Sequence, residues 1–268
     1  MASTVQNSER SKNEWIRGSI LIYWSIFWLF NIADKIIGGS HFLWVGRDRF
    51  AQFQKFFASA GLEAPIVADV ALIIAAALEV FAFVFFSGAL IHFFRRKQSE
   101  ARTWFLLGTC FTLITFTIFS FGDHLFGDRF ELLEHTLFWF MTLASWVIFT
   151  HLERANEDQA LVQDRRQLIG ASAMSALLIL ATTVSIFNYN EHFFYRRTAA
   201  IAAEYVGDDV YKVSFPFLGG STVFEKTIEN FKTDHPDKRI NHIYTVPDPL
   251  RLKKADGLIF YIITEEKS

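Results

Sequence analysis

The sequence predicts an all-α membrane protein, in which a four-helix transmembrane bundle is followed by a fifth transmembrane helix and a small α+β tail. The 268-residue chain is 51% hydrophobic, and its mean hydropathy of +0.23 is too high for an ordinary soluble domain. Its 31 Phe and 7 Trp suit lipid-facing positions and membrane interfaces. Five apolar runs of about 20 residues are each long enough to cross a hydrocarbon core roughly 30 Å thick.

The five runs define the expected domain organisation. We expect the crossings at residues 17–37, 66–92, 103–121, 130–150 and 167–187. The first four form a bundle over residues 17–150, after a cytoplasmic N-terminal segment at 1–16. A cytoplasmic loop at 151–166 leads to the fifth crossing, and residues 188–268 form the extracytoplasmic tail.

The basic residues around these runs predict the orientation of the chain. Ten Lys and Arg residues flank the runs on the same side of the membrane as the N-terminus: Arg10, Lys12, Arg17, Arg95, Arg96, Lys97, Arg102, Arg154, Arg165 and Arg166. The opposite loops hold four: Arg47, Arg49, Lys55 and Arg129. By the positive-inside rule the N-terminus is cytoplasmic, and five crossings then place the C-terminus outside. This indicates a multi-pass protein of a bacterial-type cytoplasmic (inner) membrane.

The loop after the first crossing has a helical pattern of its own. Over about residues 47–62, Phe50, Phe53 and Phe57 recur at helical spacing with polar residues between them. This pattern is typical of a helix that lies in the membrane interface with its apolar face down. Gly61 then ends the helix.

The tail has the composition of a soluble domain. DVYKVSF (209–215) and LIFYIIT (258–264) are predicted strands, and TVFEKTIENFKTDHP (222–236) is a predicted helix that Pro236 terminates. Cys110 is the only cysteine, so no internal disulfide can stabilise a domain of about 70 residues. We therefore expect the tail to contact other membrane or extracytoplasmic subunits, and no basic stripe points to nucleic acid.

The stretch FGDHLFGDRFELLEHTLFW concentrates ionisable groups at the start of the fourth crossing. Glu131 and His135 are four residues apart and share one helix face, while Glu134 lies on a neighbouring face. Asp123 and His124 come from the preceding loop, and the chain can fold them back toward this helix. The sequence therefore predicts a polar cluster at the outer membrane surface.

A further carboxylate lies inside the second crossing. Glu79 is about 13 residues from Ile66, or roughly 20 Å at 1.5 Å per residue, and so lies near the middle of the membrane. A charge at that depth is costly unless it is protonated or paired. We expect Glu79 to face the interior of the bundle.

Two interpretations of the cluster involve small ligands. In the first, Glu131, Glu134 and His135 exchange protons with a quinone-like ligand. The aromatic residues expected to wall a flat ligand are Phe126, Phe130, Phe138 and Trp139. In the second, His124, Glu131 and His135 supply nitrogen and oxygen ligands to a metal ion.

Two further interpretations remain open. Haem could be held between two histidines, either His124 with His135 or His92 with His151. In the structural alternative, Asp128 and Glu131 only offset the helix dipole and cap free N–H groups, while Arg129 or Lys35 neutralises a neighbouring carboxylate. Arg129 is also the counter-charge expected to hold the preceding loop in place. The identity of any cofactor stays undetermined at this stage.

The order of motifs resembles the DoxX-like (DoxD-like) family of small four-helix membrane proteins over about residues 15–150. The resemblance rests on the first-helix ending ADKIIGG, the interfacial FAQFQKFFASAGLEAP and the second-helix ALIIAAALEVFAFVFF, followed by a fourth helix that opens with acidic residues. It implies that Lys35, Glu79 and either Glu131 or Glu134 occupy the family's polar positions. That family includes the membrane subunit of thiosulfate:quinone oxidoreductase and partners of redox enzymes.

The resemblance implies an accessory subunit of a redox or electron-transfer complex, without a self-contained active site, that contacts quinone. The competing class is a structural or assembly subunit, in which the tail and the Phe-rich faces hold a larger complex together. A third class is a stand-alone enzyme or transporter that uses the outer cluster.

Overall fold

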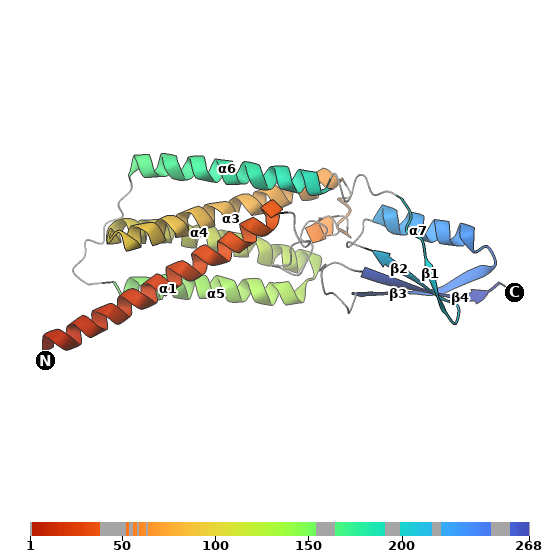
Figure 1. Cartoon of the computed structure of the whole chain (residues 1–268), viewed down its shortest axis with the longest axis horizontal. Helices are drawn as coiled ribbons and strands as arrows, with labels where there is room; N and C mark the ends of the chain where they lie inside the picture. The colour runs from red at the N-terminus through yellow and green to blue at the C-terminus, as the bar shows by residue number, and fades with distance from the viewer. Residues whose placement is uncertain are drawn as a thin grey trace. The chain divides into compact units, whose positions relative to one another are not determined.

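The computed structural model describes residues 2–37, 52–53, 56–57, 59–62, 64–153, 164–190, 199–215, 221–247 and 258–267. Its elements along the chain are α1 (Ala2–Ile37), α3 (Pro65–Phe94), α4 (Gln98–Phe126), α5 (Arg129–His151), α6 (Arg165–Asn190), β1 (Glu204–Gly207), β2 (Val210–Phe215), α7 (Ser221–Asp234), β3 (Lys238–Pro247) and β4 (Leu258–Glu266) (Figure 1). The chain divides into two compact units. The bundle unit comprises Met1–Ala33 with Ile73–Thr182, and the sheet unit comprises Asp34–Leu72 with Thr183–Ser268.

Five helices are long and apolar enough to cross a membrane, as the sequence predicts. By length and composition the spans are Lys12–Ile37, Ile66–Phe94, Gln98–Phe126, Arg129–His151 and Arg165–Asn188. Hydropathy locates the apolar part of each helix, whereas the helices themselves continue into polar flanks that also form helix readily. The chain is therefore a multi-pass membrane protein whose apolar helices suit contact with a lipid bilayer.

The helices continue past two of the expected boundaries for this reason. α1 begins at Ala2, so the N-terminal segment at 1–16 is helical from Ala2 onward. At the other end, α4 continues to Phe126, so Asp123 and His124 belong to its last turns and not to a loop. Gly127 ends α4 in the left-handed conformation (φ 76°), which costs glycine no side-chain clash.

The core of the bundle unit is aromatic. Trp24 and Trp28 of α1 are 0% and 1% exposed, and the ring of Trp24 stacks on Phe86 of α3 at 5.8 Å. Each indole N–H has a partner inside the bundle: Trp24 donates to Ser145 Oγ and Trp28 donates to Thr112 Oγ1, both at 3.0 Å. Buried Trp residues need such partners, because an unsatisfied N–H is costly in an apolar interior. These two bonds fix α1 against α5 and α4.

Glycine allows α3 and α4 to approach closely. A Cβ atom added at Gly88 would lie 2.0 Å from the Trp104 ring, and one at Gly108 would lie 3.0 Å from Phe86. Helices in membranes often pack through small residues. Lipid gives no hydrophobic driving force for helix association, so close van der Waals contact between the helices has to stabilise it. Each glycine thus accepts an aromatic ring from the facing helix.

The described part of the interfacial segment agrees with a helix. Gln52, Phe53, Phe56, Phe57 and Ser59 are helical, and the rings of Phe53 and Phe57 lie 6.4 Å apart. Gly61 ends the turn with φ 79°. The other residues expected there, including Arg47, Arg49, Phe50 and Lys55, lie outside the described residues, as does Arg154.

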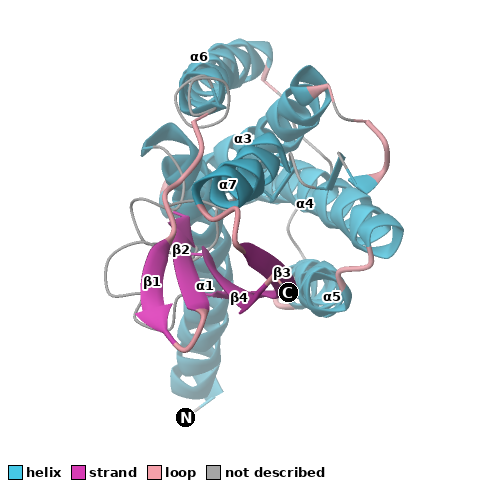
Figure 2. Cartoon of the chain, turned by 90° about the vertical axis from the view of Figure 1, so that its right-hand side faces the viewer, coloured by secondary structure: helices cyan, strands magenta, loops and turns pink. Residues whose placement is uncertain are grey.

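The sheet unit holds an antiparallel sheet with strand order β1-β2-β4-β3 and helix α7 against one face (Figure 2). Val223 and Phe231 of α7 pack on Tyr211, Val213 and Ile262. The two expected strands and the helix are present as β2, β4 and α7. The chain runs from β2 through α7 to β3, and β4 then pairs with both β2 and β3 and lies between them.

Two further strands escaped the sequence patterns. β1 has only four residues, and the pairing of β3 with β4 shifts between Ile240 and His242. Such an irregularity interrupts the alternation of polar and apolar residues by which strands are recognised. β3 is also an edge strand with charged residues, including Lys238, whose hydrogen bond to Asp209 (2.8 Å) raises its pKa above the usual value.

Replacing Gly88 with Ala should destabilise the bundle. The new Cβ would overlap the Trp104 ring, and overpacking of this kind costs about 1–3 kcal/mol. The matched control is Gly170→Ala in α6, where the new Cβ meets nothing within 4 Å. Thermal unfolding of the two variants in one detergent should show a lower midpoint for Gly88→Ala alone. Equal midpoints would contradict the close approach of α3 and α4.

Candidate functional site

The predicted cluster is centred on a hydrogen-bonded pair of side chains between α4 and α5. Nδ1 of His135 lies 2.6 Å from Oδ2 of Asp123. Both groups are withdrawn from solvent, with side-chain exposures of 12% for the imidazole and 5% for the carboxylate. Asp123 can reach across because α4 extends helically to Phe126 and turns at Gly127, which brings its last turns beside the start of α5.

Aromatic rings surround the imidazole of His135. The rings of Phe119 and Phe116 lie 5.1 Å and 5.8 Å from it, and Phe138 stacks on Phe116 at 5.4 Å. Of the aromatics expected to wall a ligand, Phe138 is therefore part of this environment. Two of its three rings come from α4, which the sequence did not indicate. We call Asp123, His135, Phe116, Phe119 and Phe138 the hairpin site.

The remaining expected aromatics lie elsewhere or contribute differently. Phe130 is 60% exposed, so its ring cannot enclose a ligand with the buried pair. Phe126 is half-buried in the last turn of α4. Trp139 donates its indole N–H to Thr117 Oγ1 at 3.2 Å, which joins α5 to α4 one turn away from His135.

The acidic residues at the start of α5 have separate environments. Asp128 is the N-cap, and its Oδ1 accepts a hydrogen bond from the N–H of Glu131 at 3.0 Å. The side chain of Glu131 is 3% exposed, whereas Glu134 is half-buried. The capping role that the structural alternative expects thus belongs to Asp128.

Two expected members do not join the pair. His124 is exposed, since it follows the buried Asp123 directly and a helix turns by about 100° per residue. Arg129 is also exposed, and no acidic side chain among the described residues lies within ion-pair distance of it. The expectation that Arg129 is the counter-charge was wrong; the partner of the carboxylate of Asp123 is His135.

The expected metal and haem ligands are dispersed. No group of three or more His, Cys, Asp or Glu in the described part of the chain could hold a metal ion. A haem between two histidines calls for two rings that face the interior. His124 and His151 are exposed, while His92 is buried against Trp104 at 5.4 Å, so neither expected pair has two buried rings.

Of the polar residues implied by the family resemblance, Lys35, Glu79 and Glu131 are buried and Glu134 is half-buried. Glu79 is 2% exposed in the bundle unit, which places its carboxylate inside the protein and not in lipid. In the sheet unit, Lys35 is 5% exposed, and the neighbouring Asp34 and Asp69 are 2% and 1% exposed. Each of these buried groups takes part in a polar or electrostatic interaction, as burial of a charge requires.

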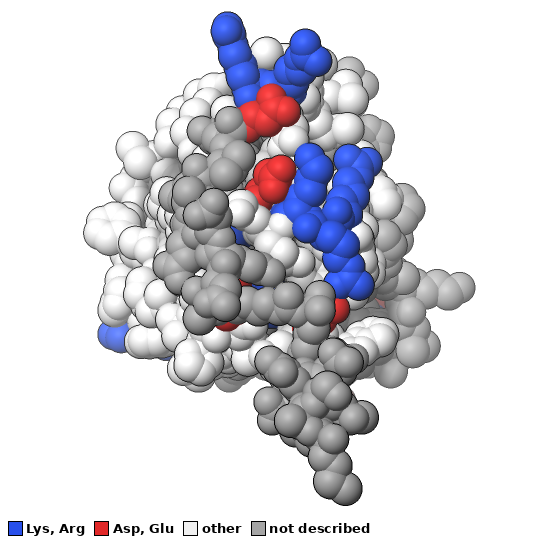
Figure 3. Space-filling model, turned by 90° about the vertical axis from the view of Figure 1, so that its left-hand side faces the viewer, with Lys and Arg blue, Asp and Glu red and all other residues white. Residues whose placement is uncertain are grey.

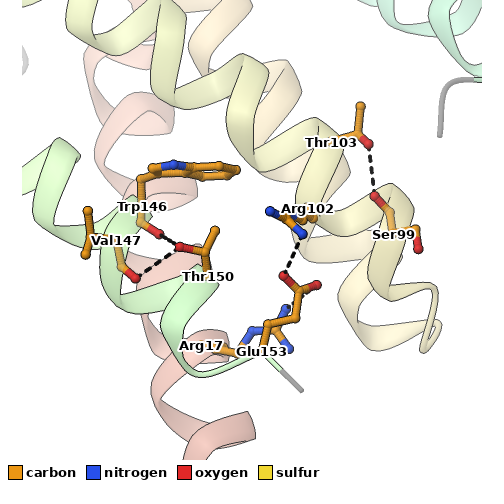
Figure 4. Close-up of polar contacts among 8 residues, drawn as sticks. All are labelled: Arg17, Ser99, Arg102, Thr103, Trp146, Val147, Thr150 and Glu153. Carbon is orange, nitrogen blue, oxygen red and sulfur yellow. Dashed lines mark hydrogen bonds and ion pairs between the residues drawn. The ribbon is translucent and has the colours of Figure 1, made fainter. Parts of the chain in front are cut away.

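A second buried charge cluster was not foreseen. Glu153, just after α5, lies between two arginines: Oε1 is 3.6 Å from Arg17 of α1, and Oε2 is 3.5 Å from Arg102 of α4 (Figure 4). The guanidinium of Arg17 also lies 4.1 Å from the centroid of Phe149. From the sequence, Arg17 and Arg102 served only to predict the orientation of the chain, because charges at helix ends are expected in any membrane protein.

Comparison with known protein families, with characterised proteins and with solved structures finds no match for this chain.

Replacing Glu153 with Gln should destabilise the bundle strongly. The change leaves the buried guanidinium of Arg17 and the half-buried one of Arg102 facing a neutral amide, and loss of one partner of a buried ion pair costs about 3 kcal/mol. Glu100→Gln is the control, because its pair with the half-exposed Lys97 contributes about 0.5 kcal/mol. Denaturant unfolding in mixed micelles measures both variants. Equal losses of stability would contradict a structural role for the Glu153 cluster.

Proposed function

We propose that this chain is an accessory subunit of a membrane redox or electron-transfer complex, and that its hairpin site contacts a quinone-like ligand. The observation that carries the proposal is the Asp123–His135 pair, which is buried among phenylalanine rings. A carboxylate and an imidazole inside an apolar bundle are costly, and a proton-exchanging ligand gives them a use.

The chemistry of the pair suits proton exchange. Imidazole is the side chain that changes charge most readily between about pH 5 and 8. Asp123 engages Nδ1 of His135, which orients the ring and leaves Nε2 to exchange a proton with a ligand. Quinone reduction consumes two electrons and two protons; the electrons come from the partner subunits and the pair relays protons. Flat aromatic rings such as Phe116 and Phe119 are suitable neighbours for a planar ligand.

The same proposal places the chain among DoxX-like proteins of a bacterial-type cytoplasmic membrane, with α6 and the sheet unit as additions that dock a larger assembly. It is supported by the order of the apolar helices and by the burial of Lys35, Glu79 and Glu131. The resemblance singles out Lys35, Glu79 and either Glu131 or Glu134. In this orientation the hairpin site lies at the outer surface of the membrane.

A structural or assembly subunit is the second candidate, and one observation favours it. The Asp123–His135 pair joins two consecutive helices across a short turn, so it can hold the α4–α5 hairpin without any ligand. The Asp128 cap serves the same turn. In this case the chain has no chemistry of its own.

Substitution of His135 with Gln, and separately of Asp123 with Asn, distinguishes the two candidates. In the intact complex, purified through a tag on this chain, each change should lower quinone-dependent turnover by about 100-fold, the lower range for loss of an acid–base group. Asp128→Asn is the control, because Asn caps a helix as well as Asp does. Subunit ratios are measured beside turnover. Full turnover with a loss of partner subunits would establish the structural candidate and overturn the first.

The proposed orientation has its own test. Reporter fusions before Lys12 and after Lys267 should show a cytoplasmic N-terminus and an extracytoplasmic C-terminus, because the basic flanks lie on the N-terminal side. Alkaline phosphatase, which is active only outside, and a fluorescent protein that folds inside give opposite signals at each end. Phosphatase activity at the N-terminal fusion, or its absence at the C-terminal one, would contradict the topology.

A further inference from the structure

Basic side chains gather at the end of the bundle unit that is opposite to the hairpin site along α4. The α3–α4 turn carries Arg95, Arg96 and Lys97, and α6 begins with Arg165 and Arg166. All five side chains are exposed. Figure 3 shows the Lys and Arg side chains of this face in two groups, each beside an acidic side chain. We call these five residues the basic end.

Part of this charge is neutralised within the protein. Arg96 pairs with Glu14 at 2.8 Å, and Lys97 pairs with Glu100 at 3.4 Å. No acidic side chain among the described residues lies within ion-pair distance of Arg95, Arg165 or Arg166. Within the described part of the chain, these three guanidinium groups therefore make no ion pair.

The α3–α4 turn and the start of α6 are neighbours. The side chain of Gln167, next to Arg166, interacts with His92, which precedes Arg95 by three residues in α3. The contact brings Arg95 and the two arginines of α6 to one place on the surface. Arg95, Arg165 and Arg166 therefore lie on neighbouring parts of one end of the bundle unit.

Buried polar atoms at this place point to a missing polar partner. His92 is 6% exposed, and its Nδ1 has no hydrogen-bond partner among the described residues. The same holds for Oε1 of Gln98 at the start of α4.

Apolar side chains beside the basic end distinguish a lipid from a soluble anion. Phe94 is 64% exposed, Ile91 is 50% exposed and Ile169 is 60% exposed, and all three lie within four residues of the arginines. A headgroup held by the arginines would therefore place its acyl chains along helix faces that already suit lipid. A free phosphate would gain nothing from these apolar surfaces.

We propose that the basic end binds the headgroup of an anionic phospholipid through Arg95, Arg165 and Arg166, beside His92 and Gln167. The phosphate is held by charge-assisted hydrogen bonds from the guanidinium groups, for which planar donors are well suited. By the positive-inside rule this end faces the cytoplasmic leaflet. The site is independent of the proposed redox function, since it lies at the other end of α4.

The test uses the full chain in a neutral detergent, titrated with phosphatidylglycerol and separately with phosphatidylcholine, with bound lipid counted by native mass spectrometry. The protein should bind phosphatidylglycerol preferentially. Arg95→Gln/Arg165→Gln/Arg166→Gln should weaken this binding by about fivefold for each removed charge, and so by roughly 100-fold. The three side chains are exposed, so the variant should keep its unfolding midpoint without lipid.

The matched control removes the same charge elsewhere: Arg129→Gln/Lys226→Gln/Lys232→Gln, all at exposed positions. This control should bind phosphatidylglycerol as the unchanged protein does. The proposal is overturned by equal binding of the two lipids, by equal losses in variant and control, or by displacement of the lipid with millimolar inorganic phosphate. If the triple variant is unstable, the single variant Arg95→Gln replaces it in the same test. Its affinity for phosphatidylglycerol should fall by about fivefold.

Discussion

Charge inside an apolar bundle must be partnered by charge, and this constraint determines how the bundle unit is arranged. Water cannot compensate a buried ion, so each ionised group needs a counter-ion or hydrogen bonds at the helix contact where it lies. At one end, Glu153 brings Arg17 and Arg102 together and thereby joins α1 and α4 to the end of α5. At the other end, Asp123 and His135 join α4 to the start of α5. The register between α4 and α5 is thus fixed at both ends.

Aromatic packing fills the space between the two charged ends. From the Glu153 cluster, Phe149 packs on Phe105 at 4.5 Å, Phe105 on Phe86 at 5.5 Å, and Phe86 on Trp24 at 5.8 Å. Toward the hairpin site the ring contacts continue through Phe27 to Phe138 at 5.0 Å. Rigid rings in contact resist small displacements, since interiors are close-packed and rotamers interdigitate. Such packing suits a phenylalanine-rich bundle that holds the hydrogen-bonded Asp123–His135 pair at 2.6 Å between two helices.

The sequence allows the helices to be located, but not the contacts between them. Apolar length identified all five crossings, because a bilayer imposes one length on every span. Within one helix, spacing also showed that Glu131 and His135 share a face. The real partner of His135 is Asp123 from the preceding helix, and spacing within a helix carries no information about which helix faces it. For the same reason Glu153 was overlooked: its partners Arg17 and Arg102 are 136 and 51 residues away.

In the sheet unit, the irregular edge strand β3 lacked the alternation by which β2 was recognised.

The central claim is that a quinone-like ligand binds at the hairpin site, and photoaffinity labelling tests it most directly. The intact complex in lipid nanodiscs is illuminated with a ubiquinone analogue that carries an azide on its ring, and labelled peptides are identified by mass spectrometry. The account predicts labelling of the peptides that contain Phe116, Phe119 or His135, and its loss when excess unlabelled quinone is present. Labelling confined to other subunits, or to lipid-facing parts of this chain, would contradict the assignment of the hairpin site to a ligand.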